Sequence, residues 1–307
     1  MQPIKGITLK LCAVVLFIIM ASLIKAASEH VPPGEAVFFR SLFAIPVILG
    51  WLWWRGALAT GLRVTSPASH FWRGFVGTLA MGLGFAGLGL LPLPEVTALG
   101  YAAPLLTVIF AAMFLNEKVG IFRISTVGLG LIGVLIVLSP RLTAFSNETV
   151  ETTQALGAIL VLMSAMLAAL AQIYIRKMVA TEQTSAIVFY FSLTSTLLSL
   201  VTIPFGWVWP ETWEVVCLVL AGVIGGTAQI FLTSAYRFAD ASVVAPFDYA
   251  SMIFALVIGY VVFDEVPTQT MLLGAAIVIL AGIIIIWREH KLGLKRGKAR
   301  SMKTPQG

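Results

Sequence analysis

The chain contains ten apolar stretches of roughly 20 residues, each long enough, at about 1.5 Å of rise per residue, to cross about 30 Å of hydrocarbon. A backbone in hydrocarbon must satisfy its hydrogen bonds internally, so these stretches have to be helical. Hydrophobic residues make up 59% of the chain and charged residues 11%, which leaves little material for a soluble domain. We therefore expect an all-α integral membrane protein with transmembrane helices near 7–27, 34–54, 70–91, 95–115, 122–139, 155–175, 184–204, 213–235, 241–263 and 268–287.

The first five segments and the last five carry matching residues in the same order, as expected of an internal repeat. The matches are Lys25 with Arg176 at an offset of 151, and Gly77 with Gly225, Tyr101 with Tyr249 and Asn116-Glu117 with Asp264-Glu265 at an offset of 148. Because five is an odd number, the second repeat must be inverted in the bilayer. We predict a first five-helix repeat at 1–140, a periplasmic linker at 141–153, an inverted second repeat at 154–288 and a basic cytoplasmic tail at 289–307, disordered from Lys291 onward.

The positions of the cationic residues predict the orientation of the chain. With a cytoplasmic N-terminus, only Lys25 and Arg141 of the 20 Lys and Arg residues lie on the outer side and Arg40 lies within the membrane, which leaves 17 on the inner side. This predicts a multi-pass protein with both termini in the cytoplasm. The net charge of +6 belongs to these inner loops and to attraction to anionic lipid, so nucleic acid is not a predicted partner.

The sequence has no motif for nucleotide hydrolysis and no predicted catalytic or metal cluster. It lacks a GxxxxGK[ST] loop, which excludes a P-loop as the energy source. His30, His70 and His290 all fall at or beyond segment ends, so no histidine cluster lies within the predicted membrane region. We expect no cofactor, no bound metal and no enzymatic activity.

Two charges inside predicted spans are the first candidates for function, because a charge in hydrocarbon is costly unless it is paired or hydrated. Arg40 in the second segment is expected either to lock helices through an internal ion pair or to hold a substrate carboxylate or phosphate by bidentate hydrogen bonds. Asp248 follows Pro246 in the ninth segment, where proline removes a backbone donor and opens the helix. Its candidate roles are to bind a substrate amine, to take up a driving proton, or to pair with Arg40.

Four further polar residues are candidates for the site or for proton coupling. Glu35 and Glu95 lie at the outer ends of the second and fourth segments, where the helix dipole stabilises a carboxylate, so capping and proton coupling are both open. Gln172 and Gln229 are mid-span amides of the sixth and eighth segments. Interhelical hydrogen bonding and substrate contact are both open for these two.

Aromatic and proline residues give two further predictions, one about the wall of a cavity and one about the shape of two helices. Tyr101 and Tyr249 occupy equivalent positions in the two repeats and are predicted to face one cavity, as an aromatic wall with polar tips for the substrate. Pro46 and Pro104 are predicted to kink the second and fourth segments.

Short motifs lie at the ends of several segments: EAVFFR at Glu35–Arg40, FLNE at Phe114–Glu117, DASVVAPFDY at Asp240–Tyr249 and FDE at Phe263–Glu265. In these motifs the chain resembles, over nearly its whole length, the ten-helix drug/metabolite transporter superfamily and in particular its EamA-domain members. The resemblance implies an inner-membrane secondary carrier, and by motif it carries over Arg40, Glu117 and Glu265. The APFxY stretch resembles the branch that contains carriers of S-adenosylmethionine, riboflavin and metallophores.

The combined prediction is a secondary transporter that moves a small organic metabolite by alternating access of its two halves. Arg40 and Asp248 favour a zwitterionic, amino-acid-derived solute such as a metallophore, and export is favoured by the resemblance. The alternatives are an importer of S-adenosylmethionine or riboflavin and, from another class, a passive channel or facilitator. Candidate partners are the solute, the lipid bilayer, a proton gradient and a second copy of the chain in a homodimer.

Overall fold

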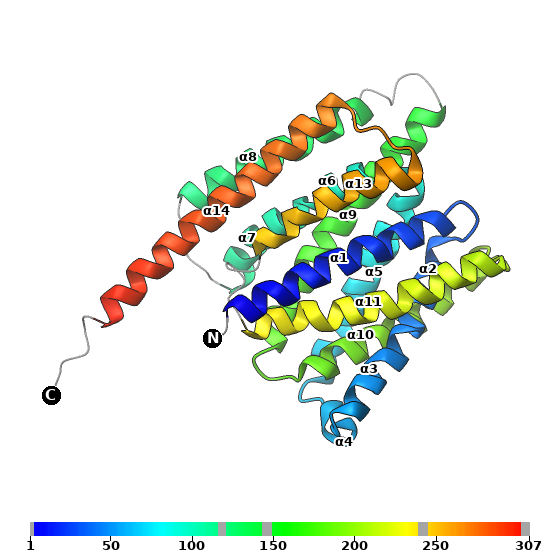
Figure 1. Cartoon of the computed structure of the whole chain (residues 1–307), viewed down its shortest axis with the longest axis horizontal. Coiled ribbons are helices and arrows are strands. Elements are labelled where there is room, and N and C mark those ends of the chain that lie inside the picture. The colour runs from blue at the N-terminus through cyan, green and yellow to red at the C-terminus, as the bar shows by residue number, and fades with distance from the viewer. Residues whose placement is uncertain (1–2, 116–120, 143–148, 239–244, 302–307) are drawn as a thin grey trace.

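The structure is a computed structural model that describes residues 3–115, 121–142, 149–238 and 245–301. Every regular element in these ranges is helical (Figure 1). The elements are α1 (Pro3–Ala27), α2 (Pro33–Leu42), α3 (Ala44–Trp54), α4 (Leu58–Gly61), α5 (Pro67–Leu90), α6 (Leu93–Gly100), α7 (Ala102–Leu115), α8 (Ile121–Leu142), α9 (Thr149–Met178), α10 (Thr184–Ser199), η2 (Leu200–Phe205), α11 (Thr212–Phe238), η3 (Ala245–Ala250), α13 (Ser251–Phe263) and α14 (Gln269–Ser301).

Each of the ten predicted segments overlaps one or two of these helices. Six helical stretches of the described residues are long and apolar enough to cross a membrane: Ile4–Ala27, Pro33–Trp54, Pro67–Leu90, Thr152–Met178, Thr184–Phe205 and Thr212–Phe238. Shorter apolar helices lie at Ser125–Ser139, Phe247–Phe263 and Gln269–Ile284. The structure therefore has the helices that a multi-pass membrane protein needs.

The predicted kinks at Pro46 and Pro104 are confirmed, because both segments are interrupted just before the proline. α2 ends at Leu42 and α3 begins at Ala44, and the amide of Phe43 donates to the carbonyl of Phe39. The second break, at Tyr101, separates α6 from α7. A proline cannot donate to the carbonyl four residues earlier, which is where each first helix ends.

The ninth and tenth segments differ in detail from the expectation. Residues 245–250 form the 3₁₀ helix η3 rather than α-helix, so the backbone is tightened at Asp248 and continues as α13 from Ser251. The predicted disorder of the tail from Lys291 is wrong, because α14 stays helical to Ser301. Asp240, Ser242 and Val244 of the ninth segment lie outside the described residues.

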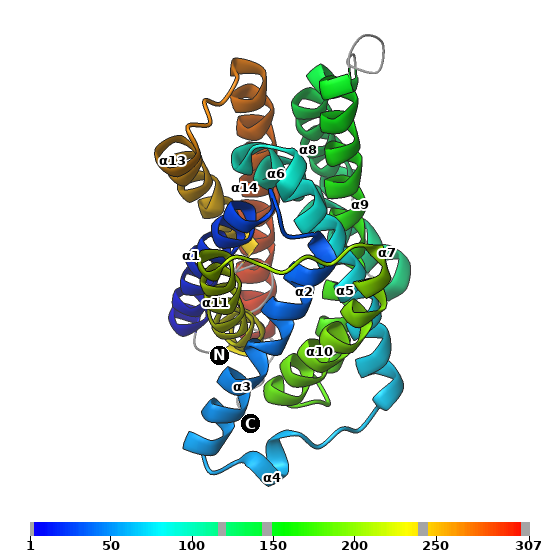
Figure 2. The same cartoon turned by 90° about the vertical axis from the view of Figure 1, so that its right-hand side faces the viewer.

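The closest helix pairs join the two predicted halves. α1 packs along α11, α5 along α9 and α8 along α14 (Figure 1). In the predicted repeat, α1 corresponds to α9, α5 to α11 and α8 to α14. Exchanging corresponding helices therefore turns the α1–α11 pair into the α9–α5 pair and leaves the α8–α14 pair unchanged. α2 lies beside α5, α10 and α11 (Figure 2), which places Arg40 between helices of both halves. α1 begins and α14 ends on the same side of the bundle (Figure 1).

One ion pair ties these halves together at the end of the bundle where α1 ends. Lys25 Nζ lies 3.0 Å from Glu265 Oε1 and also donates to the carbonyls of Leu88 and Leu91. Glu265 Oε2 accepts the amide of Leu93 at 2.8 Å. Asp264, with a left-handed φ of 54°, ends α13 and turns Glu265 toward α1 and the start of α6. The FDE motif therefore has a structural role, because it ends α13 and places Glu265 beside Lys25.

At the same end, the loop between α1 and α2 contacts α11 through His30. His30 Nδ1 lies 3.0 Å from Glu214 Oε2, and this hydrogen bond raises the pKa of His30 above its ordinary value of 6.5. A raised pKa means that protonated His30 stabilises the folded state fully below pH 6.5 and that this stability is lost as the pH rises through the folded-state pKa.

We therefore expect His30→Gln to lower the melting temperature of the purified protein at acid pH and to have progressively less effect as the pH rises. The measurement is the melting temperature of wild type and variant, side by side, from below pH 6.5 to well above it. Subtracting the two curves removes the contribution of titrating groups that do not interact with His30, and it leaves those of His30 and its partner Glu214. A difference in melting temperature that stays constant or grows with pH would contradict a stabilising contact between protonated His30 and Glu214.

Candidate functional site

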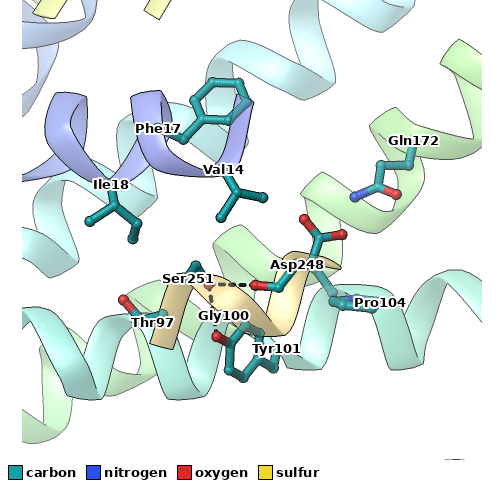
Figure 3. A pocket seen from close by; sticks show the side chains of 11 residues that line it. Val14, Phe17, Ile18, Thr97, Gly100, Tyr101, Pro104, Gln172, Asp248 and Ser251 are labelled. Carbon is teal, nitrogen blue, oxygen red and sulfur yellow. Dashed lines mark hydrogen bonds between the residues drawn. The ribbon is translucent and has the colours of Figure 1, made fainter. Parts of the chain in front are cut away.

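Two neighbouring cavities lie inside the bundle and share Phe17, Thr97 and Gln172 in their walls. The smaller has a volume of about 270 Å³ and is lined by residues of α1, α6, α7, α9, η3 and α13 (Figure 3). The larger, about 340 Å³, is lined by residues of α1, α2, α5, α6, α9, α10 and α11. Helices of both predicted halves therefore surround each cavity.

The charge in the smaller cavity is Asp248, and its partner is Lys10. Asp248 Oδ1 lies 2.7 Å from Lys10 Nζ, and Lys10 is 2% exposed. Lys10 Nζ also lies 5.5 Å from the centre of the Tyr236 ring. The structure thus pairs Asp248 with Lys10 and not with Arg40, which was one of the three roles considered. In Figure 3 the carboxylate of Asp248 and the amide of Gln172 both point into the cavity.

The two tyrosines at equivalent repeat positions are in contact, but they have different surroundings. Their ring centres are 5.0 Å apart, and the Tyr101 hydroxyl lies 2.7 Å from Ser251 Oγ and donates to the Tyr249 carbonyl at 3.3 Å. Tyr101 lines the smaller cavity, whereas Tyr249 packs behind it against Gly282 of α14. Ser251 Oγ in turn donates to the Asp248 carbonyl, which links Tyr101 to the turn that holds Asp248.

The larger cavity contains two arginines that lie within membrane-length helices. Arg40 of α2 and Arg73 of α5 line it together with Gln172, Gln229 and Phe191. The Cζ atoms of Arg40 and Arg73 lie 5.4 Å and 3.9 Å from the centre of the Phe191 ring. Both glutamines predicted from the sequence therefore lie in cavity walls, and Gln172 is shared by the two cavities.

The two predicted glutamates lie in the first turns of their helices, away from this pair of arginines. Glu35 of α2 is 2% exposed and accepts the amide of Val208 at 3.1 Å, so it joins α2 to the segment before α11. Glu95 is in the first turn of α6 and is 8% exposed. Neither glutamate lines either cavity, whereas Arg40, Tyr101, Gln172, Gln229 and Asp248 all do.

Sequence reasoning overlooked Lys10 and Arg73, which it placed among the 17 cationic residues of the inner side. Both are buried, at 2% and 4% exposure, and Arg73 lines the larger cavity. The signal was present, because both lie inside the predicted apolar segments 7–27 and 70–91, as Arg40 does in 34–54. Applying the rule for charges within spans to every segment would have found them.

A bundle of apolar helices with charged side chains in largely apolar cavities, whose walls come from both halves of the chain, is typical of a small-molecule transporter of the membrane. The chain belongs to the EamA-like transporter family, whose sequence model matches residues 4–139 and 155–288. It is accordingly a multi-pass membrane protein. Glu117, which the family motif singles out beside Arg40 and Glu265, lies outside the described residues.

Named relatives transport different solutes. The chain is 32% identical over 284 residues to the pseudopaline exporter CntI of Pseudomonas aeruginosa, covering 91% of this chain and 95% of that protein. It is 28% identical over 257 residues to the S-adenosylmethionine uptake transporter of Rickettsia felis, covering 84% of each. A solved crystal structure with 20% identity superposes with a TM-score of 0.68 over 94% of this chain and 98% of the other, which supports the same fold.

Proposed function

We propose that this transporter has ten transmembrane helices in two inverted five-helix repeats, 1–140 and 154–288, joined by a periplasmic linker at 141–153. It resides in the inner membrane with the N-terminus and the basic tail 289–307 in the cytoplasm. Two observations support this: the family model covers two ranges of similar length, and the helix pairs α1–α11 and α5–α9 are exchanged when the halves are swapped. With Lys10 and Arg73 removed from the inner side, the Lys and Arg asymmetry is still 15 against two.

The larger cavity is the proposed substrate site, and Arg40 is the residue that carries the proposal. Arg40 lies where α2 of the first half meets α10 and α11 of the second. A solute held there therefore contacts both halves, which move relative to each other in alternating access. In alternating access the Lys25–Glu265 pair closes the outer end of the bundle and must separate when that end opens. Gln172 and Gln229 supply amide hydrogen bonds to the solute from α9 and α11.

The proposed substrate is a zwitterionic, amino-acid-derived compound, such as a metallophore, and the proposed direction is export. Arg40 binds its carboxylate, and Asp248 receives its amine when the Lys10–Asp248 contact is given up. The relative named as a pseudopaline exporter supports the direction. Asp248 is also the proposed proton-coupling residue, with Glu35 and Glu95 as the alternatives, and the assembly is proposed to be a homodimer.

Uptake of S-adenosylmethionine is the second candidate, and the relatives named for that activity favour it. A sulfonium compound that also carries an amine and one carboxylate would use Asp248 more than Arg40. Riboflavin, which is uncharged, would use neither. A passive facilitator is the alternative of another class, and it would show flux that ignores a proton gradient and survives Asp248→Asn.

The test is an untargeted comparison of metabolites in cytosol and medium between a deletion strain and strains complemented with wild type, Arg40→Ala or Asp248→Ala. We expect one compound to accumulate inside and vanish from the medium on deletion, and both variants to fail to restore it. Arg55→Ala, which removes an exposed arginine at the end of the same helical segment, is the matched control and should complement. Membrane levels of each variant are checked by immunoblot.

The opposite distribution, with a compound depleted inside, would establish uptake and reject export. Complementation by both variants at normal membrane levels would remove Arg40 and Asp248 from the site.

A further inference from the structure

The larger cavity contains two arginines that both contact one aromatic ring. Arg40 comes from α2 and Arg73 from α5, both in the first half of the chain, and Phe191 comes from α10 in the second half. The guanidinium of Arg73 lies over the ring at 3.9 Å and that of Arg40 lies 5.4 Å from its centre. Such contacts stabilise a cation, but they do not satisfy its N–H donors.

Both guanidinium groups are buried, and neither makes a hydrogen bond through Nε or Nη1 to a residue that the structure describes. Arg40 is 2% exposed and Arg73 is 4% exposed, and Nε and Nη1 of each have no hydrogen-bond partner within the described part of the chain. None of the ion pairs between described residues includes either arginine. A buried unpaired charge is costly, and two of the same sign in one cavity repel each other as well. The arrangement is therefore incomplete without an anionic occupant.

None of the described residues that line the larger cavity supplies that anion. Asp248 lies in the neighbouring cavity and is held by Lys10 at 2.7 Å. The polar groups in the wall of the larger cavity besides the arginines are neutral, namely Thr97, Ser164, Gln172 and Gln229. Ser164 already donates to the carbonyl of Ala80 at 2.6 Å. The rest of the wall is largely apolar, which suits an organic skeleton.

Two glycines make room for the pair of cations. A Cβ at Gly77 would overlap Arg73 Nη1 and come within 2.9 Å of Phe191, and a Cβ at Gly225 would lie 3.1 Å from Arg40 Nε. Gly77 and Gly225 are the residues that align at the repeat offset of 148. Each half thus contributes a small residue at the place where a guanidinium has to lie.

We propose that Arg40 and Arg73 form one subsite that binds the transported solute through two carboxylate groups, one on each guanidinium. This deepens the proposed function and rests on it, because it names the class of solute for the same cavity. An arginine binds a carboxylate through two parallel hydrogen bonds, so two adjacent arginines match a dicarboxylate better than any solute with one acidic group. A solute with a net positive charge is disfavoured.

The first test uses binding rather than transport. Purified wild-type protein is heated with glutarate, with its half-amide glutaramate or with inorganic phosphate, all at matched ionic strength, because a ligand raises the melting temperature according to its affinity. We expect glutarate to bind about tenfold more tightly than glutaramate, the ratio that one charge-assisted bidentate pair supplies. In Arg73→Met and in Arg40→Met that ratio should fall to about one. Equal stabilisation of wild type by glutarate and glutaramate would overturn the proposal.

The melting temperature of the ligand-free variants provides a second test, because a merely structural role of Arg73 predicts the opposite change. Because Arg73 is buried and unpaired beside Arg40, Arg73→Met should raise the melting temperature of the empty protein. A lower melting temperature would mean that Arg73 has a structural partner, and it would overturn the proposal. Stabilisation of wild type by phosphate, but by neither organic acid, would assign the pair to a phosphate group and reject the dicarboxylate.

Gly77→Ala displaces Arg73 without changing the charge of the cavity, and it should lower the preference for glutarate. Gly82→Ala on the same helix is the matched control, since the nearest atom to its Cβ, Val37 Cγ2, is 4.0 Å away.

Failure of this inference is distinguishable from failure of the proposed function. If Arg40→Met and Arg73→Met abolish export while glutarate and glutaramate bind equally, the transport site stands and the two-carboxylate class is wrong. If both variants still export, the proposed site itself is wrong.

Discussion

Replacing Asp248 by Asn is expected to lower the free energy of unfolding by about 3–5 kcal/mol, the cost of leaving one member of a buried ion pair without its partner. The charge left behind is Lys10, whose side chain is 3% exposed and lies 2.7 Å from Asp248. Lys10→Met should cost less, because the Asp248 side chain is 28% exposed and solvent can therefore reach it. Unfolding of the purified variants in a denaturing detergent titration measures both values.

The double variant Lys10→Met/Asp248→Asn separates the pair from its surroundings. Once both charges are removed, most of the lost stability should return, because neither member of the pair is left as a charge without its partner. Transport should not return, since the proposed amine and proton site is gone. A double variant as unstable as the sum of the two single variants would show that the two side chains act independently. Equal losses in the two single variants would contradict the difference expected from their exposure.

The second large effect is expected where α8 and α14 touch through their backbones. A Cβ at Gly133 would lie 2.8 Å from the carbonyl oxygen of Gly274 and 2.9 Å from the amide nitrogen of Val278. These are backbone atoms, which cannot rotate away as a side chain does. Gly133→Ala should therefore push the helices apart and cost about 1–3 kcal/mol, or more if the helices cannot shift.

Gly128→Ala is the control for Gly133→Ala, because it lies on the same helix and its Cβ would meet no atom within 4 Å. It should leave the stability within about 1 kcal/mol of wild type, since alanine is the better helix former. The melting temperature and the yield of folded protein after detergent extraction measure both variants. Similar losses at the two positions would attribute the effect to glycine itself rather than to the contact of α8 with α14.

The secondary structure was largely predictable because a bilayer permits few alternatives. Apolar stretches of membrane length have to be helical, and each predicted segment overlaps helix in the structure. The breaks before Pro46 and Pro104 followed equally from the lost backbone donor. The extent of α14 did not follow, because a basic composition after Trp287 does not by itself end a helix.

The candidate site was only partly predictable. Arg40, Gln172, Gln229, Tyr101 and Asp248 were singled out because polar groups within apolar spans require a reason, and they do lie in cavity walls. What the sequence could not provide is which charge lies beside which. From the sequence, pairing with Arg40 was one of three candidate roles of Asp248. In the bundle, Lys10 of α1 lies against Asp248 instead.

By itself, then, the sequence determined that this chain is helical and built for a membrane, because burial of a backbone in hydrocarbon and the distribution of charge are properties of the linear chain. Only the tertiary structure decided the chemistry of the site. Residues 33 positions apart, Arg40 and Arg73, meet over Phe191 of the other half because α2, α5 and α10 pack together. Which charges are neutralised and which are left for a solute depends on that packing, since attraction between charges acts through space and not along the chain.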